Sequence, residues 1–168
     1  RPEVAQAIIN RFLFDKREQL EIASRLALIY PSSFLKLSPT ESTDILERVS
    51  IRALPCWEVI VDMDANSWHD QRFMAHTYYL SIPEAKEKFG SKDYTAIPKV
   101  EFFTPQEKFS GVSDDLPDDY LYIQVVEFYD MLYDQLYFWS PSYKEGEGLL
   151  AKEEIPVRTY DDQPLTPI

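Results

Sequence analysis

The chain has 168 residues and a mass of 19.7 kDa, which is enough for one ordinary domain with its own hydrophobic core. Its 17 basic and 29 acidic residues give a net charge of −12, which argues against a protein that binds nucleic-acid phosphates through Lys and Arg. The single cysteine, Cys56, excludes an internal disulfide and a cysteine-rich zinc site. No apolar run approaches the ~20 residues that span a bilayer and no signal-peptide pattern opens the chain, so we expect neither feature.

Residues 2–30 carry the clearest helical pattern. Pro2 suits the first turn, and no further Pro or Gly follows before Pro31. Apolar residues recur mostly at steps of three and four, namely Val4, Ile8, Ile9, Phe12, Leu13, Leu20, Ala23, Leu26, Ala27 and Tyr30. This pattern predicts one long amphipathic helix from Pro2 to Tyr30. Its apolar face would cover the core of the chain or contact another subunit, and the sequence leaves both alternatives open.

Short β-like runs follow the predicted helix. β-branched and aromatic residues alternate with polar ones in these runs, which are Ile45–Ile51, Trp57–Val61 and Phe73–Leu80. Ser81 and Glu84 then form a capping-box pattern, and Gly90 stands where a helix usually stops. We therefore expect three strands followed by a short helix that ends at Gly90.

The second half of the chain predicts a long loop, a hairpin and a tail. Residues 91–119 contain Pro, Gly and a cluster of carboxylates, which is typical of a solvated loop. The runs Tyr120–Asp130 and Gln135–Trp139 predict two strands joined by a turn at 131–134. Residues 143–168 carry two glycines and three prolines, so we expect an irregular exit segment with one edge strand around Ile155–Tyr160.

Together these elements predict an α+β fold with one long helix, one short helix and a mostly antiparallel sheet of about five strands. We expect residues 1–168 to form a single domain or a fragment of a longer chain.

Nine aromatic residues fall between Tyr120 and Tyr143, where the average composition of the chain would place about three. Rings in this number need cover, either from the chain's own core or from a neighbouring molecule. The alternation of Tyr120, Tyr122, Val126 and Phe128 is compatible with both arrangements, and both stay open.

The best candidate for a metal site is the acidic turn that holds Asp62, Asp64 and Asp70. Oxygen-bearing side chains at alternate positions resemble the start of a calcium-binding loop. However, Ser67 replaces the glycine that such a loop needs, and Phe73 replaces its bidentate glutamate. A calcium- or metal-binding module, or a metal-dependent enzyme using these three aspartates, is therefore the alternative hypothesis. We prefer an Asx-rich turn that ends the preceding strand.

Residues suited to catalysis are few. The two histidines are His69, in the acidic turn, and His76, in a predicted strand where a structural role is expected. No nucleophile elbow, phosphate-binding loop, dinucleotide-binding glycine pattern or H-E-x-x-H motif occurs. Cys56 has no cationic neighbour in the sequence that would generate a thiolate. We therefore predict no enzyme activity, no cofactor, and no catalytic, cofactor-binding or metal-binding residues.

Several segments occur in a distinctive order. Residues 55–65 contain a proline, then tryptophan-glutamate-valine, then aspartate-x-aspartate-alanine. A strand-like segment with His76 follows, and then a helix start at Glu84-Ala85. Residues 125–130 (VVEFYD) and 135–139 (QLYFW) form a hairpin pattern, followed by the proline-containing segment 155–168. In this order the segments resemble the portal proteins of tailed bacteriophages, although portals often have glycines where residues 31–33 (PSS) stand here.

The resemblance covers most of the chain from Val4 onward and implies part of the portal wing region. Portal proteins form a ring, commonly of twelve subunits, at one vertex of the capsid. The ring is the conduit for DNA packaging and ejection, and it meets the major capsid protein, the terminase packaging motor and a head-to-tail adaptor. Such a subunit is made in the host cytoplasm and becomes part of the virion.

A portal ring lets double-stranded DNA pass without sequence-specific binding. An acidic surface suits that role because it repels phosphates over a Debye length of about 8 Å at physiological salt. A third hypothesis, an acidic mimic of DNA, is less favoured because the carboxylates cluster in one loop and do not run in paired rows.

Overall fold

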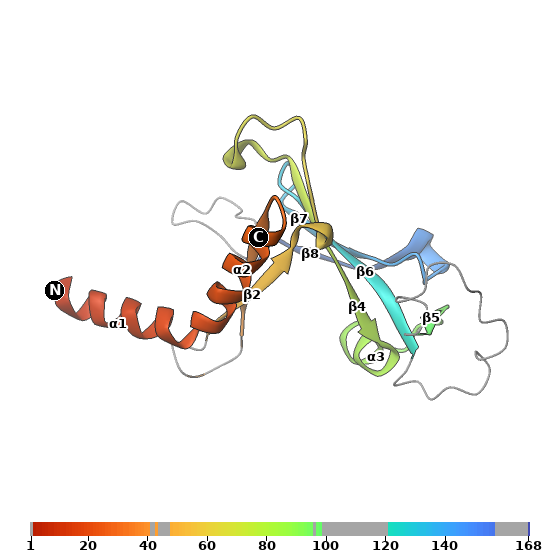
Figure 1. Cartoon of the computed structure of the whole chain (residues 1–168). Coiled ribbons are helices and arrows are strands. Elements are labelled where there is room, and N and C mark those ends of the chain that lie inside the picture. The colour runs from red at the N-terminus through yellow and green to blue at the C-terminus, as the bar shows by residue number, and fades with distance from the viewer. Residues whose placement is uncertain (1, 41–42, 44–47, 96, 99–120, 157–167) are drawn as a thin grey trace. The chain divides into compact units, whose positions relative to one another are not determined.

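The computed structural model describes residues 2–40, 43, 48–95, 97–98, 121–156 and 168. The chain divides into two compact units, one comprising Arg1–Ile60 with Pro156–Ile168 and the other Val61–Ile155. The chain combines helices with antiparallel sheets, so the predicted α+β class is confirmed (Figure 1).

The first unit begins with two helices, α1 (Pro2–Asp15) and α2 (Arg17–Ile29). The prediction of one continuous helix is therefore wrong at Lys16, whose φ of −98° and ψ of 6° interrupt the helical backbone. Residues 15–19 (DKREQ) are all charged or polar, so the helix has no apolar side chain here that could pack against a core.

A hairpin completes the described part of the first unit. Its strands β1 (Ser33–Pro39) and β2 (Val49–Pro55) pair antiparallel, with Ser33 opposite Pro55 and Pro39 opposite Val49. Two hydrogen bonds join helix α2 to this hairpin. The Ala53 N–H donates to Gln19 Oε1 (3.0 Å), and Ser33 Oγ donates to the carbonyl of Ala23 (2.8 Å).

The strand predicted at 45–51 is displaced in the structure. Strand β2 begins at Val49 and extends to Pro55, and residues 44–47 lie outside the described part. The extension follows from pairing with β1, a strand that the sequence analysis did not predict. Leu54 of β2 is fully buried and anchors the hairpin.

The second unit is built on an antiparallel sheet. Its strand order is β3, β4, β6, β7, β8, with the short β5 also pairing with β6. The bounds are β3 (Val59–Val61), β4 (Phe73–Ser81), β5 (Ile97–Pro98), β6 (Leu121–Asp130), β7 (Gln135–Trp139) and β8 (Leu149–Glu154). The division between the two units falls within β3. The predicted strands at 73–80, 120–130 and 135–139 are confirmed to within one residue at either end.

One face of this sheet forms the core of the second unit. Residues of β6 alternate between buried and half-buried, and Ile123, Val125, Glu127 and Tyr129 make up the buried set. Helix α3 (Ile82–Phe89) packs here, with the rings of Phe89 and Phe138 5.3 Å apart. The short helix is confirmed.

The capping box that begins α3 is present in full, since Glu84 Oε2 accepts from the N–H (2.8 Å) and the hydroxyl (2.7 Å) of Ser81. Gly90 follows the helix with a φ of +82°, a value that glycine adopts without strain. These contacts fix where the helix starts and stops.

The tail contains more regular structure than predicted. Strand β8 occupies Leu149–Glu154, whereas the edge strand was expected around Ile155–Tyr160, of which residues 157–160 lie outside the described part. The glycines that suggested an irregular segment instead form a tight reversal that returns the chain to β7. The Ser140 N–H donates to the carbonyl of Gly148 (2.9 Å), and Trp139 Nε1 donates to that of Glu147 (2.8 Å).

Replacing Gly148 tests this reversal. A Cβ at Gly148 would lie 2.5 Å from Trp139 Nε1 and 2.7 Å from the Ser140 carbonyl, whereas at Gly146 it would meet nothing within 4 Å. Both residues have positive φ, so Gly146→Ala should lower the unfolding free energy by about 1 kcal/mol for the backbone alone. We expect Gly148→Ala to lower it by at least about 1 kcal/mol more, because the clash adds to the backbone strain. Urea unfolding of the two variants measures the difference, and equal losses would contradict the contact.

Candidate functional site

The acidic turn between β3 and β4 is organised around an ion pair. Asp62 is only 3% exposed, and both of its carboxylate oxygens accept from Arg72, at 2.5 Å from Nε and 2.8 Å from Nη2. This is a bidentate guanidinium–carboxylate pair, the stronger geometry for such contacts. Nη2 of Arg72 also donates to Asp64 Oδ2 (3.2 Å), whose side chain is 87% exposed. The guanidinium holds the pKa of Asp62 down at about 2.

The backbone of the turn depends on the same carboxylate. Asp62 Oδ1 accepts from the N–H of Asp64 (3.1 Å), which is the geometry of an Asx turn. The N–H of Asp62 donates to Gln71 Oε1 (2.8 Å), and this bond ties the start of the turn to its end. The predicted Asx-rich turn after the strand is therefore confirmed.

The three aspartates proposed as metal ligands do not act together. Asp62 and Asp64 face Arg72, while Asp70 Oδ2 accepts from Ser67 Oγ (2.8 Å). In the part of the chain that the structure describes, no three His, Cys, Asp or Glu side chains lie close enough to hold a metal ion. The side chain of His69 lies outside that part. Sequence analysis missed the role of Arg72, because an ion pair across a turn leaves no motif.

His76 belongs to a buried polar cluster on the covered face of the sheet. It lies opposite Glu127, with Nδ1 3.8 Å from Oε2, and its ring stacks on Tyr78 at 4.9 Å. Glu127 Oε1 accepts from the hydroxyl of Tyr129 at 2.5 Å. Burial, with the charge of Glu127 adding to it, raises the pKa of Tyr129 above its ordinary value. His76 and Tyr129 are at most 2% exposed, so this cluster joins β4 to β6 and offers no surface to a substrate.

The aromatic residues predicted to need cover are divided between core and surface. Tyr129 and Phe138 are buried, whereas Tyr133 and Trp139 are exposed. Tyr122, Phe128, Tyr137 and Tyr143 are half-buried, and Tyr120 lies outside the described residues. The chain's own core therefore covers part of the set, and cover by a neighbouring molecule stays a prediction for the exposed rings.

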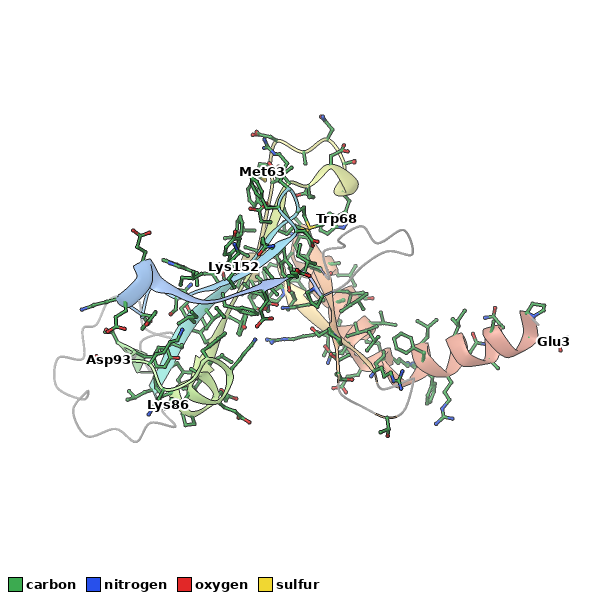
Figure 2. All side chains as sticks on the ribbon, turned by 180° about the vertical axis from the view of Figure 1, so that it is seen from behind. Glu3, Met63, Trp68, Lys86, Asp93 and Lys152 are labelled. Atoms are coloured by element: carbon green, nitrogen blue, oxygen red, sulfur yellow. The ribbon has the colours of Figure 1, made fainter. Side chains whose placement is uncertain are left out.

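Four large apolar side chains are exposed at one end of the sheet, a surface we call the sheet tip. Met63 and Trp68 come from the turn before β4, where Figure 2 labels both, and Leu132 and Tyr133 come from the β6–β7 turn. The two turns are joined, since the Met131 N–H donates to the carbonyl of Arg72 (3.0 Å). Asp130 Oδ1 further fixes the second turn by accepting from the N–H groups of Leu132 (3.1 Å) and Tyr133 (3.2 Å).

The helices of the first unit also expose apolar residues. All described side chains of α1 are exposed except that of Phe12, which is half-exposed. Among the described side chains, the exposed large apolar ones are those of Ile9, Leu13 and Phe14 on α1, and of Ile22, Leu28 and Ile29 on α2. In α2 the only buried residue is Ala23, so little of the predicted apolar face is covered by the described part of the chain.

No protein-family model and no curated protein sequence matches the chain. Within the described residues, no helix is long and apolar enough to cross a membrane.

Neutralising Asp62 should loosen the acidic turn. We expect Asp62→Asn to lower the melting temperature by several degrees, because it removes the buried carboxylate of a bidentate pair whose guanidinium is half-exposed, and because it weakens the Asx turn. The matched variant Asp64→Asn should change it much less, since that carboxylate is exposed and its pairing is screened. Differential scanning fluorimetry at neutral pH compares the two, and equal effects would contradict the central role of Asp62.

The same pair predicts how stability depends on pH. The pKa of Asp62 falls from 3.8 to about 2 on folding, so its contribution is complete above pH 3.8 and is lost as the pH falls toward 2. The difference in melting temperature between the wild type and Asp62→Asn should therefore shrink over that interval. If the difference in melting temperature stayed constant from about pH 5 to about pH 2, the charge of the Asp62 carboxylate would not be what stabilises the turn.

Proposed function

We propose that the chain is a structural subunit of a bacteriophage portal ring, forming part of its wing region. In this role it makes or breaks no covalent bonds. Identical copies assemble into a ring, commonly of twelve, that conducts DNA during packaging and ejection. The ring also provides the attachment point for the packaging motor and the tail.

One observation carries the proposal, namely the apolar surface that the described part of the chain leaves exposed on α1. A helix of 14 residues is marginally stable in water by itself, and most helices depend on packing of an apolar face. Ile9 and Leu13 lie one turn apart on such a face, yet both are exposed. A neighbouring copy in an assembly would supply the missing cover.

The kind of assembly is argued from the order of segments between Trp57 and Gly90. This stretch, which resembles portal proteins, corresponds to β3, the Asx turn around Asp62, strand β4 and helix α3. The resemblance thus follows a continuous series of elements whose ends are fixed by specific contacts, those of Asp62 and of Ser81. A net charge of −12 supports a passage role, because it disfavours tight binding of the DNA that must slide through.

The proposal implies defined partners and a location. Besides its own copies, the subunit would meet the major capsid protein, the terminase motor and a head-to-tail adaptor. Double-stranded DNA would pass through the ring without sequence-specific binding. The subunit would be made in the host cytoplasm and would end in the virion at the portal vertex.

Ring formation is the direct test. The full gene product that contains this sequence should give ring particles with a central hole in negative-stain electron microscopy, and a mass of many subunits by mass photometry. Monomers that persist at micromolar concentration would overturn the proposal.

A pair of variants tests whether the apolar face of α1 contributes to assembly. Ile9→Ser with Leu13→Ser should shift the particles toward monomers by mass photometry, because two apolar side chains no longer become buried between copies. Gln6→Ser with Asn10→Ser is the matched control on the same helix, where the lost side chains are polar and exposed and bond to each other (2.9 Å). Equal effects of the two pairs would show that α1 acts only through its own stability.

A further inference from the structure

We propose that the sheet tip of one copy docks into a shallow hollow along α2 of the next copy. This inference rests on the proposed function and deepens it by naming the two surfaces that meet. The tip consists of Met63, Trp68, Leu132 and Tyr133 of the second unit. The hollow is lined by Arg17, Leu20, Glu21, Ser24, Arg25 and Leu28 of the first unit.

The sheet tip has the composition of a contact surface. Met63 is 88% exposed, Tyr133 73%, Leu132 69% and Trp68 45%. Aromatic residues and Met are enriched at protein interfaces, and side chains of this size that gather at one end of a sheet call for a partner.

The sheet tip is also preorganised, because hydrogen bonds within the chain fix both of its turns. The Asp62–Arg72 pair closes one turn, Asp130 caps the other, and the Met131–Arg72 backbone bond joins the two. A preformed surface loses less conformational entropy on binding than a loop that must first become ordered.

The charge of the tip restricts what it can bind. The two turns and their flanks carry five aspartates, Asp62, Asp64, Asp70, Asp130 and Asp134, against one arginine, Arg72. An apolar cluster with an acidic rim fits a surface that is apolar at its centre and basic at its edge.

The hollow on α2 offers that chemistry. Leu20 and Leu28 supply apolar contact, and Leu28 is 87% exposed. Arg17 is paired with Glu21 at 2.7 Å, so the hollow keeps a net positive charge from Arg25. These residues recur at helical steps along one stripe of α2, which a compact tip can follow.

Charge distribution identifies a second copy as the occupant. The first 30 residues hold five basic and four acidic residues, so the remaining 138 hold 12 basic and 25 acidic ones. The helical segment therefore does not repel an acidic tip, whereas the turn at residues 62–70, with three aspartates and no Lys or Arg, would. A copy of the chain therefore supplies the complement that the tip needs.

The contact joins two different patches, which makes it head-to-tail. Such an interface leaves one unused tip and one unused hollow on every incomplete assembly, and it becomes saturated only when a ring closes. In a head-to-tail interface, a variant with a damaged tip can still pair with a variant that has a damaged hollow. This pairing can be tested by mixing the two variants.

The experiment uses two variants of the full gene product and their mixture. The tip variant carries Trp68→Ser and Leu132→Ser, and the hollow variant carries Arg25→Ser and Leu28→Ser. By mass photometry, each alone should remain monomeric at a concentration where the wild type forms rings. An equimolar mixture should give one-to-one pairs and no larger particle, because each pair has one intact tip and one intact hollow. Leu149→Ser, at an exposed leucine of β8, is the control and should leave ring formation unchanged.

The possible outcomes separate this inference from the proposed function. If the wild type forms rings and both variants do so as well, the docking contact is wrong and the portal proposal stands. If the wild type forms open chains that the two variants abolish, the contact is right and the ring is wrong. Variants that remain monomeric separately and also when mixed would overturn the head-to-tail pairing, and circular dichroism establishes that each is folded. Wild-type monomers overturn both proposals.

Discussion

The pairing of β4 with β6 is the constraint on which the second unit depends. It runs from Phe73 opposite Asp130 to Ser81 opposite Tyr122 without a register shift. One end of the pair fixes the start of α3, because Ser81 is both the last residue of β4 and the N-cap of the helix. The other end fixes the sheet tip, because the turns before β4 and after β6 must meet where the two strands end.

Polar residues inside the sheet make this register specific. A slip of β6 by one residue against β4 would move Glu127 to the opposite face, away from His76 of β4. A carboxylate that is 7% exposed is costly to bury unless its oxygens are bonded, and here Oε1 accepts from Tyr129 while Oε2 faces His76 across the strand pair. The cluster therefore adds specificity to a face whose stability comes from apolar neighbours such as Ile123 and Val125. This gives a structural reason for a histidine and a glutamate to lie in the core.

Local signals predicted the elements that depend on local contacts. The capping box at Ser81 and Glu84 could be predicted because its residues are close together in the sequence. The same holds for the alternation of buried and half-buried residues in β6. Strands β1 and β8 were missed or misplaced because each is defined by a partner strand, and residues 149–154 (LLAKEE) have little β propensity of their own. At the candidate site, the Asx turn was predictable from its aspartates. The ion pair with Arg72 was not, since it depends on where a residue ten positions later is placed by β4.

The chain combines a strong negative charge with exposed apolar side chains, and these two features have opposite effects on association between copies. A chain with open apolar patches tends to aggregate, and a net charge of −12 opposes that tendency by mutual repulsion between copies. Repulsion would be weak where the helical segment, with five basic and four acidic residues, met another copy in the proposed assembly. Apolar contact could outweigh charge at that position, while contacts between acidic surfaces would stay unfavourable. In a portal subunit this balance would direct association toward one orientation, and the same acidic remainder would leave the passing DNA unbound.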